Sequence, residues 1–268
     1  MISAIVITKN EEKFIAGCLE SLKWADEVIV FDNFSKDKTV EIAKKYTKQV
    51  FEGDVANFSD HRNKAAEKAK GDWLLFVDAD ERVSKELRVE ILEKIKQNTL
   101  SSFALPRRNI IFGQQVKYAA FSPDYVLRLF KKDQFTGYIG DIHEQPQVKG
   151  ERGSTDNSLI HFTHRNLDQI VNKSLAWSHV DAKLRFDSNH PPMSGWRFIR
   201  ILVSELFNQL IKRGGIKGGT VGIIDAILQT FSFVMSYVRL WEMQQPEPLD
   251  QKYHNLDQEL LENDFTLK

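Results

Sequence analysis

The chain has 268 residues, 42% of them hydrophobic and 28% charged, a composition typical of folded globular proteins and not of disordered or fibrous ones. Its 37 basic and 37 acidic residues cancel, so we expect no nucleic-acid partner. The single cysteine, Cys18, excludes an internal disulfide and a cysteine-based zinc site.

The N-terminal sequence has no basic segment and only a short apolar run, so we expect no signal peptide and a cytoplasmic location. The longest uncharged apolar stretch is Ala226–Val238, which is shorter than the roughly 18–20 residues of a membrane span. These features argue against a secreted or an integral membrane protein.

Three apolar segments in the first eighty residues are predicted to be buried strands: Ile2–Thr8, Glu27–Asp32 and Asp72–Val77. Helical patterns alternate with them, at Glu11–Lys23 with Asn10 as its expected N-cap, at Thr39–Tyr46, at Phe58–Ala69, and at Leu87–Ile95 after Ser84 as a cap. This alternation predicts a doubly wound α/β fold with a parallel sheet covered by helices on both faces.

The pattern of alternating strands and helices ends at about Ser101. Short strand-like pieces broken by Gly and Pro predict an antiparallel extension of the sheet up to about Phe162. A helical pattern then continues to about Met243, interrupted by Pro191-Pro192 and by the glycine-rich run Arg213–Gly219. We therefore expect an α/β domain over residues 1–165, a helical extension over 166–245, and a loose peripheral tail over 246–268.

Polar residues follow each predicted strand of the first domain, at the edge where open parallel sheets bind ligands. The strands end in Thr8-Lys9-Asn10-Glu11, in Asp32-Asn33 and in Asp78-Ala79-Asp80-Glu81. One acid after a strand is most often a helix cap, but three such ends at one edge favour a shared site. Asp78 and Asp80 form a D-x-D motif and offer hard oxygen ligands for Mg²⁺ or Mn²⁺; the alternative is a pair of solvated turn acids.

No glycine-rich phosphate loop stands between a predicted strand and a helix. The glycine run 214–219 follows a helical pattern and is predicted to be an interhelical turn. A nucleotide bound here would therefore need a metal and basic side chains to neutralise its phosphates.

The segments IVITKNEE, CLESLKWADEVIVFDNFSKDKTVEIA and HRNKAAEKAKGDWLLFVDADERVSKEL together resemble family-2 inverting glycosyltransferases, which have the GT-A fold. The segments PRRNIIFG, SPDYVLRLFKK and DIHEQPQV resemble the lipopolysaccharide-core β-glucosyltransferase subgroup, whose members add a sugar to an inner-core heptose. The resemblance covers about Ile2–Phe162 strongly; the helical part shares composition and a final Leu240–Glu242 segment.

This resemblance implies a Rossmann-like, mostly parallel sheet flanked by helices, with a C-terminal helical extension that faces the acceptor or a membrane. It also implies transfer of a hexose, expected to be glucose, from a UDP-linked donor to a glycolipid acceptor. The residues that it assigns to the nucleotide-sugar donor are Thr8, Asn10, Glu11, Asp32, Arg62, Asn63, Asp78 and Arg128. Asp78 and Asp80 would hold the divalent metal, Mg²⁺ or Mn²⁺, on the diphosphate.

Sugar transfer leaves negative charge on the departing diphosphate, which the metal and Arg128, with Lys131 or Lys132, would offset. An inverting displacement also needs a carboxylate to take the proton of the acceptor hydroxyl. The resemblance offers Glu144 and Asp124, of which we favour Glu144.

His143, next to Glu144, would orient this base or contact the metal. For His143 and for His161, the alternative is a histidine that is hydrogen-bonded within the core or a loop.

Other functions compete with this interpretation. A metal-dependent nucleotidyltransferase or hydrolase also presents carboxylates beside a sheet, but a nucleotidyltransferase usually has a basic, glycine-rich first loop, whereas this loop is the acidic TKNEE. A family-2 transferase acting on another glycan or on a peptide is a second alternative. A sugar-binding protein without enzymatic activity would not need the metal pair.

The region Trp196–Met243 has apolar residues at helical spacing and six basic against three acidic residues, a local charge of +3. These helices are expected either to pack within the protein, including as a homodimer interface, or to lie on anionic lipid. We expect salt-sensitive peripheral association with the inner face of the plasma membrane.

Overall fold

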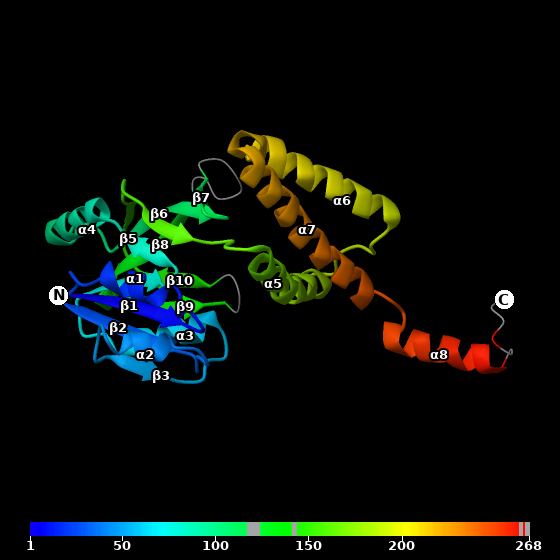
Figure 1. Ribbon diagram of the computed structural model, residues 1–268, viewed down its shortest axis with the longest axis horizontal. Helices are drawn as coiled ribbons and strands as arrows, with labels where there is room; N and C mark the ends of the chain where they lie inside the picture. Colours follow the sequence, from blue (N-terminus) through cyan, green and yellow to red (C-terminus); the bar gives the residue numbers. More distant parts are fainter. Residues whose placement is uncertain (117–123, 141–143, 263–264, 266–268) are drawn as a thin grey trace. The chain divides into compact units, whose positions relative to one another are not determined.

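The computed structural model describes residues 1–116, 124–140, 144–262 and 265 (Figure 1). These residues form two compact units, of which the first ends at Arg165 and the second begins at Asn166. The described strands lie in the first unit together with four helices, and the second unit is helical. The mixed α/β class with C-terminal helices is confirmed.

The first unit contains many short elements. Its strands are β1 (Ile2–Thr8), β2 (Glu27–Asp32), β3 (Val50–Glu52), β4 (Trp73–Asp78), β5 (Glu81–Val83), β6 (Ser102–Ile111), β7 (Gln114–Gln115), β8 (Asp124–Lys131), β9 (Phe135–Ile139), β10 (Gln145–Val148), β11 (Arg152–Ser154) and β12 (Leu159–Phe162). Its helices are α1 (Ile15–Glu20), α2 (Thr39–Ala43), α3 (Phe58–Glu67) and α4 (Lys85–Gln97), with a 3₁₀ turn at Lys132–Gln134.

The main sheet has the strand order β3-β2-β1-β4-β8-β6-β12-β5. The first four strands are parallel, and β8 runs antiparallel to both β4 and β6, as predicted for the region after Ser101. Strand β12 instead runs parallel to β6, and β9 and β10 form a separate hairpin. Because β1, β2 and β4 are parallel neighbours, their carboxyl ends meet at one edge of the sheet.

The parallel strands are buried on both faces, which explains their continuous apolar sequences. Along β1, Ala4 and Val6 face one hydrophobic cluster with residues of α1 and α4, whereas Ile5 and Ile7 face a second cluster with residues of α3 and β9. Each of these four side chains is at most 7% exposed. The sheet is therefore a rigid platform for the residues that follow its strands.

The expected N-cap at Asn10 is wrong. Helix α1 begins only at Ile15, and Asn10 has a φ of 55°, a left-handed conformation that asparagine tolerates better than most residues. Its Oδ1 accepts a hydrogen bond from Lys36 N at 2.8 Å, and its backbone N donates to Ser35 Oγ at 2.7 Å. Asn10 thus joins the loop after β1 to the loop after β2. The predicted cap at Ser84 is confirmed.

The second unit consists of four helices: α5 (Leu167–Asp187), α6 (Gly195–Phe207), α7 (Gly219–Met243) and α8 (Leu249–Glu262). A π-helical turn at Asn208–Lys212 and a 3₁₀ turn at Gly215–Gly218 connect α6 to α7. The breaks fall where Pro191-Pro192 and the glycine run predict them. The tail differs from the expectation, since α8 occupies much of it.

One segment of the described residues, Gly215–Met243, is long and apolar enough to cross a membrane by length and composition alone. Its best 18-residue window has a mean hydropathy of 1.6, and 39% of that window is buried. The uncharged stretch Ala226–Val238 lies within this segment, which is longer because it also includes charged residues such as Asp225 and Arg239.

Candidate active site

Asp78, the last residue of β4, is clamped by two arginines. Its Oδ1 accepts a hydrogen bond from Arg62 Nη2 of α3 at 2.9 Å, and its Oδ2 accepts one from Arg128 Nη2 of β8. Both arginines are buried. Burial alone would raise the pKa of the Asp78 carboxyl, but the charges of Arg128 and Arg62 hold that pKa well below its ordinary value. Asp78 is therefore a fixed anion at the centre of the site.

Asp78→Asn is expected to destabilise the fold by roughly 3 kcal/mol, because it leaves two buried guanidinium groups without their shared carboxylate. Thermal unfolding of the variant measures this loss. Asp72→Asn is the matched control, since Asp72 is an exposed residue paired with the N-terminal amine, and we expect little change. Equal melting temperatures for the two variants would contradict the structural role of Asp78.

Glu81 connects Asp78 to a further arginine, Arg107. Glu81 is fully buried; its Oε2 accepts a hydrogen bond from Asp78 N at 2.9 Å, and its Oε1 lies 3.6 Å from Arg128 Nη2 and from Arg107 Nη1. Arg107 of β6 in turn pairs with Asp124. Sequence reasoning did not single out Glu81 or Arg107 as site residues, although both lie in segments that carry the family resemblance.

Asp80 differs from Asp78 in its electrostatic environment, because the charges around its carboxyl group are mainly negative. Burial, followed by the charges of Asp78, Glu81 and Glu11, raises the pKa of the Asp80 carboxyl to about 7, and Arg165 opposes this only in part. The side chain keeps 22% of its surface exposed. A partly exposed carboxylate in an excess of negative charge is a suitable ligand for a cation.

His161 lies close to Asp80, with Nε2 at 3.8 Å from Oδ2. Its tautomer follows from the hydrogen bonds behind it. Asp124 can only accept, so Asn109 directs its Nδ2 to Asp124 at 3.3 Å and its Oδ1 to His161 Nδ1 at 2.7 Å. Nδ1 therefore donates to Asn109, and Nε2 lies on the side of the ring toward Asp80.

No group of three His, Cys, Asp or Glu side chains within the described ranges is arranged to hold a metal. Asp80 with His161 nevertheless fits a divalent ion of the kind that binds through one or two protein ligands, water and substrate phosphates. Asp78, predicted as a second metal ligand, is engaged by its two arginines instead.

Metal affinity is expected to depend on the protonation of Asp80. Below its pKa of about 7 a proton competes with the metal, so the Kd for Mn²⁺ should rise as the pH falls, by up to about tenfold per pH unit. Titration of Mn²⁺ into the protein between pH 6 and 8, followed by electron paramagnetic resonance, measures this slope. Asp80→Asn should flatten it, and a slope unchanged in that variant would contradict the assignment.

Each candidate base is connected by one arginine to a carboxylate at the end of β4 or just after it: Glu144 to Asp78, and Asp124 to Glu81. Glu144 Oε1 accepts a hydrogen bond from Arg62 Nε at 3.3 Å, and Arg62 also binds Asp78. Asp124 Oδ2 accepts bonds at 2.8 Å from Arg107 Nε and Nη2, as well as the bond from Asn109. Glu144 thus has fewer bonds to the described residues and more lone pairs for a substrate hydroxyl. His143 lies outside the described residues.

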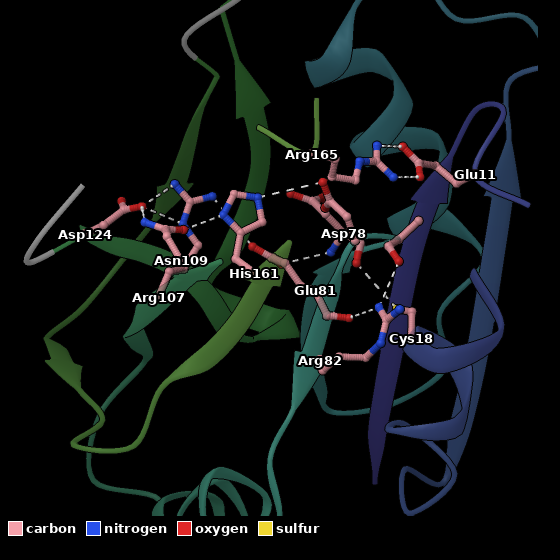
Figure 2. Close-up of polar contacts among 12 residues, drawn as sticks. Glu11, Cys18, Asp78, Glu81, Arg82, Arg107, Asn109, Asp124, His161 and Arg165 are labelled. Atoms are coloured by element: carbon pink, nitrogen blue, oxygen red, sulfur yellow. Dashed lines mark hydrogen bonds and ion pairs between the residues drawn. The ribbon is translucent and has the colours of Figure 1, made fainter. Parts of the chain in front are cut away.

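The residues expected along the nucleoside are all near the sheet edge, but several already have protein partners. Asp32 is fully buried and accepts hydrogen bonds at 2.6 Å from Ser35 N and Oγ. Thr8 is also buried. Glu11 forms a two-bond ion pair with Arg165, each bond 2.8 Å long (Figure 2). Arg165 carries no motif that would have identified it from sequence.

Asn63, expected to help hold the nucleotide, supports a hairpin instead. Its Oδ1 accepts a hydrogen bond from Tyr138 N at 2.7 Å, and its Nδ2 donates to Tyr138 O at 3.0 Å. Both functions of this side chain are therefore used to attach β9 to α3. The adjacent Arg62 bridges Asp78 and Glu144 as described above.

The open, mostly parallel sheet with an acidic segment at the end of β4 is typical of the GT-A fold. The sequence matches the profile of Glycosyl transferase family 2 over residues 3–143, and the chain belongs to that family. It is a glycosyltransferase that uses a nucleotide-sugar donor, as predicted.

Related proteins support this assignment. An uncharacterised glycosyltransferase of Rickettsia typhi is 27% identical over 90% of this chain and 87% of its own length. The lipopolysaccharide core biosynthesis glycosyltransferase LpsC of Rhizobium meliloti is 25% identical over 84% of this chain and 86% of its own. The mannosyltransferase PcManGT of Pyrobaculum calidifontis, solved with GDP-Man and Mn²⁺, shares the fold, with a TM-score of 0.55, 13% identity, and coverage of 91% and 88% of the two chains.

Proposed function

We propose that the chain transfers a hexose, glucose in the first instance, from a UDP-sugar to an inner-core heptose of lipopolysaccharide or lipooligosaccharide, or to a similar glycolipid. The observation that carries the chemistry is a pair of arginines. Arg62 connects Asp78 to Glu144, and Arg107 connects Glu81 to Asp124. The similarity to LpsC supports the acceptor class.

In the proposed reaction, Glu144 takes the proton of the acceptor hydroxyl as its oxygen attacks the anomeric carbon of the donor. The bond from that carbon to the diphosphate oxygen breaks, and the configuration at the carbon inverts. Arg62 holds Glu144 while its other nitrogen holds Asp78, so the base keeps a fixed position relative to the end of β4.

Asp80 and His161 would hold a divalent Mg²⁺ or Mn²⁺ ion, which when bound would offset the charge of the leaving diphosphate. Arg128 is a buried cation that pairs with Asp78 and lies 3.6 Å from Glu81. It keeps Asp78 ionised and in place, and therefore fixes the backbone from which Asp80 projects.

The test is a matrix of donors and acceptors with Mn²⁺ present. UDP-glucose, UDP-N-acetylglucosamine and GDP-mannose are each incubated with truncated core oligosaccharides that end in heptose, and the products are analysed by mass spectrometry. We expect one hexose to be added from UDP-glucose. Transfer only to another glycan or to a peptide would replace the proposed acceptor, and transfer only from GDP-mannose would replace the proposed donor.

A further inference from the structure

Helix α7 buries several polar side chains and exposes several apolar ones. Its buried residues include Asp225, Thr230 and Ser236, each at most 3% exposed. Its outward residues include Ile227 and Phe231, which are 51% and 48% exposed. A helix of a water-soluble domain normally places its apolar stripe inward and its polar residues outward. Water is therefore an unfavourable surrounding for the outer face of α7.

Helix α6 repeats this pattern. Trp196, Ile199, Val203 and Phe207 follow one another at intervals of three or four residues and thus share one face, and they are 52–70% exposed. The opposite side of the helix packs through Ile201 into a small cluster with residues of α5 and α7. The outward stripe of α6 consists of large apolar side chains that lie next to one another. Isolated hydrophobic residues are common on protein surfaces, but a contiguous stripe of this kind is typical of an interaction surface.

The second unit also has a polar region beside its apolar cluster. A cavity of about 260 Å³ lies among α5, α6, the π-helical turn and α7, and its lining includes Ser178, Asp181, Glu205, Gln209 and Ser236. Gln209 Nε2 donates to Glu205 Oε1 at 2.6 Å, and Ser236 Oγ donates to Asp181 Oδ2 at 3.4 Å. Polar groups facing the bundle interior and apolar groups facing outward are typical of helices in lipid.

The α6–α7 hairpin has basic residues at its turn, and tryptophans beside Arg197, Arg239 and Glu242 at its other end. The two helices run antiparallel from their connecting turn (Figure 1) and contact each other. At their other end, the backbone N of Met193, before α6, donates to Gln244 Oε1, just after α7, at 2.8 Å. The turn between them carries Lys212, Arg213 and Lys217. At the other end of the hairpin, Trp196 and Trp241 are exposed. Tryptophan prefers the membrane–water interface, and lysine and arginine attract anionic headgroups.

We propose that the outward faces of α6 and α7 insert into the hydrocarbon layer of an anionic lipid bilayer, with the basic turn at the headgroups. Apolar burial supplies most of the attachment, and the basic residues favour anionic over neutral lipid. This attachment does not depend on the proposed donor or acceptor. A second copy of the chain is the competing occupant of the same faces.

The test is flotation of the full-length protein with vesicles of phosphatidylglycerol and phosphatidylcholine, without nucleotide sugar, before and after a wash at about 1 M NaCl, where charges are screened. We expect the protein to float and to remain bound after the wash, because apolar insertion does not depend on charge. This differs from the salt-sensitive adsorption expected from the sequence. The double variant Val203→Glu, Phe207→Glu should stay in solution. Its matched control is Val89→Glu, Leu92→Glu on α4, where both residues are exposed apolar side chains of the first unit; this control should float.

Fluorescence provides a readout that does not depend on the folding of the double variant. Lipids brominated in their acyl chains should quench the tryptophan emission of the native protein, and Trp196→Phe should remove a large part of this quenching. Release by the salt wash would show surface adsorption, absence of quenching would show no insertion, and a concentration-dependent dimer that does not float would show a subunit interface. Each of these results would overturn the proposal.

Discussion

Glu144→Gln is expected to lower kcat for sugar transfer by roughly 10²–10⁴-fold, the usual effect of losing a general base. Glutamine keeps the size of the side chain and can still accept the hydrogen bond from Arg62 Nε, but it cannot take a proton from the acceptor hydroxyl. The Kd for the donor should therefore change little. Steady-state kinetics with a heptose-terminated acceptor measures the first quantity, and calorimetry with UDP measures the second.

Two comparisons make this prediction specific. Glu151→Gln, which changes an exposed glutamate a few residues further along the chain, should leave kcat unchanged. Asp124→Asn should have a smaller effect than Glu144→Gln, because the carboxylate of Asp124 is already held by Arg107 and Asn109. If Asp124→Asn lowers kcat by the larger factor, the two acids exchange roles.

Asp80→Asn should reduce transfer by about 10³-fold, equivalent to about 4 kcal/mol of lost transition-state stabilisation. The variant keeps the shape of the side chain but loses the charge that would attract a divalent ion. It should also weaken Mn²⁺ binding without lowering the melting temperature, because the replaced carboxylate lies among other carboxylates.

This combination separates Asp80 from Asp78, for which the main expected effect is loss of stability. Chelation with EDTA should reduce the activity of the native enzyme to the level of Asp80→Asn. Full activity in EDTA would exclude a metal requirement and would leave Asp80 without its proposed function.

The sequence was sufficient to predict the parallel strands β1, β2 and β4 because they are buried on both faces. The apolar runs Ile2–Thr8 and Glu27–Asp32 coincide with β1 and β2, and β4 is displaced by one residue. Short elements such as β5 were missed, since three residues cannot show a period. The start of α1 was placed too early because the apolar period continues into the turn before it.

At the site, the sequence identified the acids better than their partners. Asp78 and Asp80 form a local pattern next to a strand, whereas their electrostatic difference depends on residues distant in the chain. Arg128 lies 50 positions from Asp78, and Arg165 lies 154 positions from Glu11. No periodicity or short motif encodes such contacts, so the different pKa shifts of the two aspartates could not be predicted before the fold was known.

The consecutive residues Arg62 and Asn63 have a consequence for exchanging parts between related enzymes. One turn of α3 holds the last residue of β4 and Glu144 through the arginine, and holds β9 through the asparagine. A chimera that takes the segment from β9 to β10 from a relative therefore has the relative's residue at the position of Glu144, and this residue must pair with Arg62 of the recipient's α3. We expect such chimeras to retain turnover only when the β9–β10 segment and the turn of α3 with Arg62 and Asn63 come from the same enzyme.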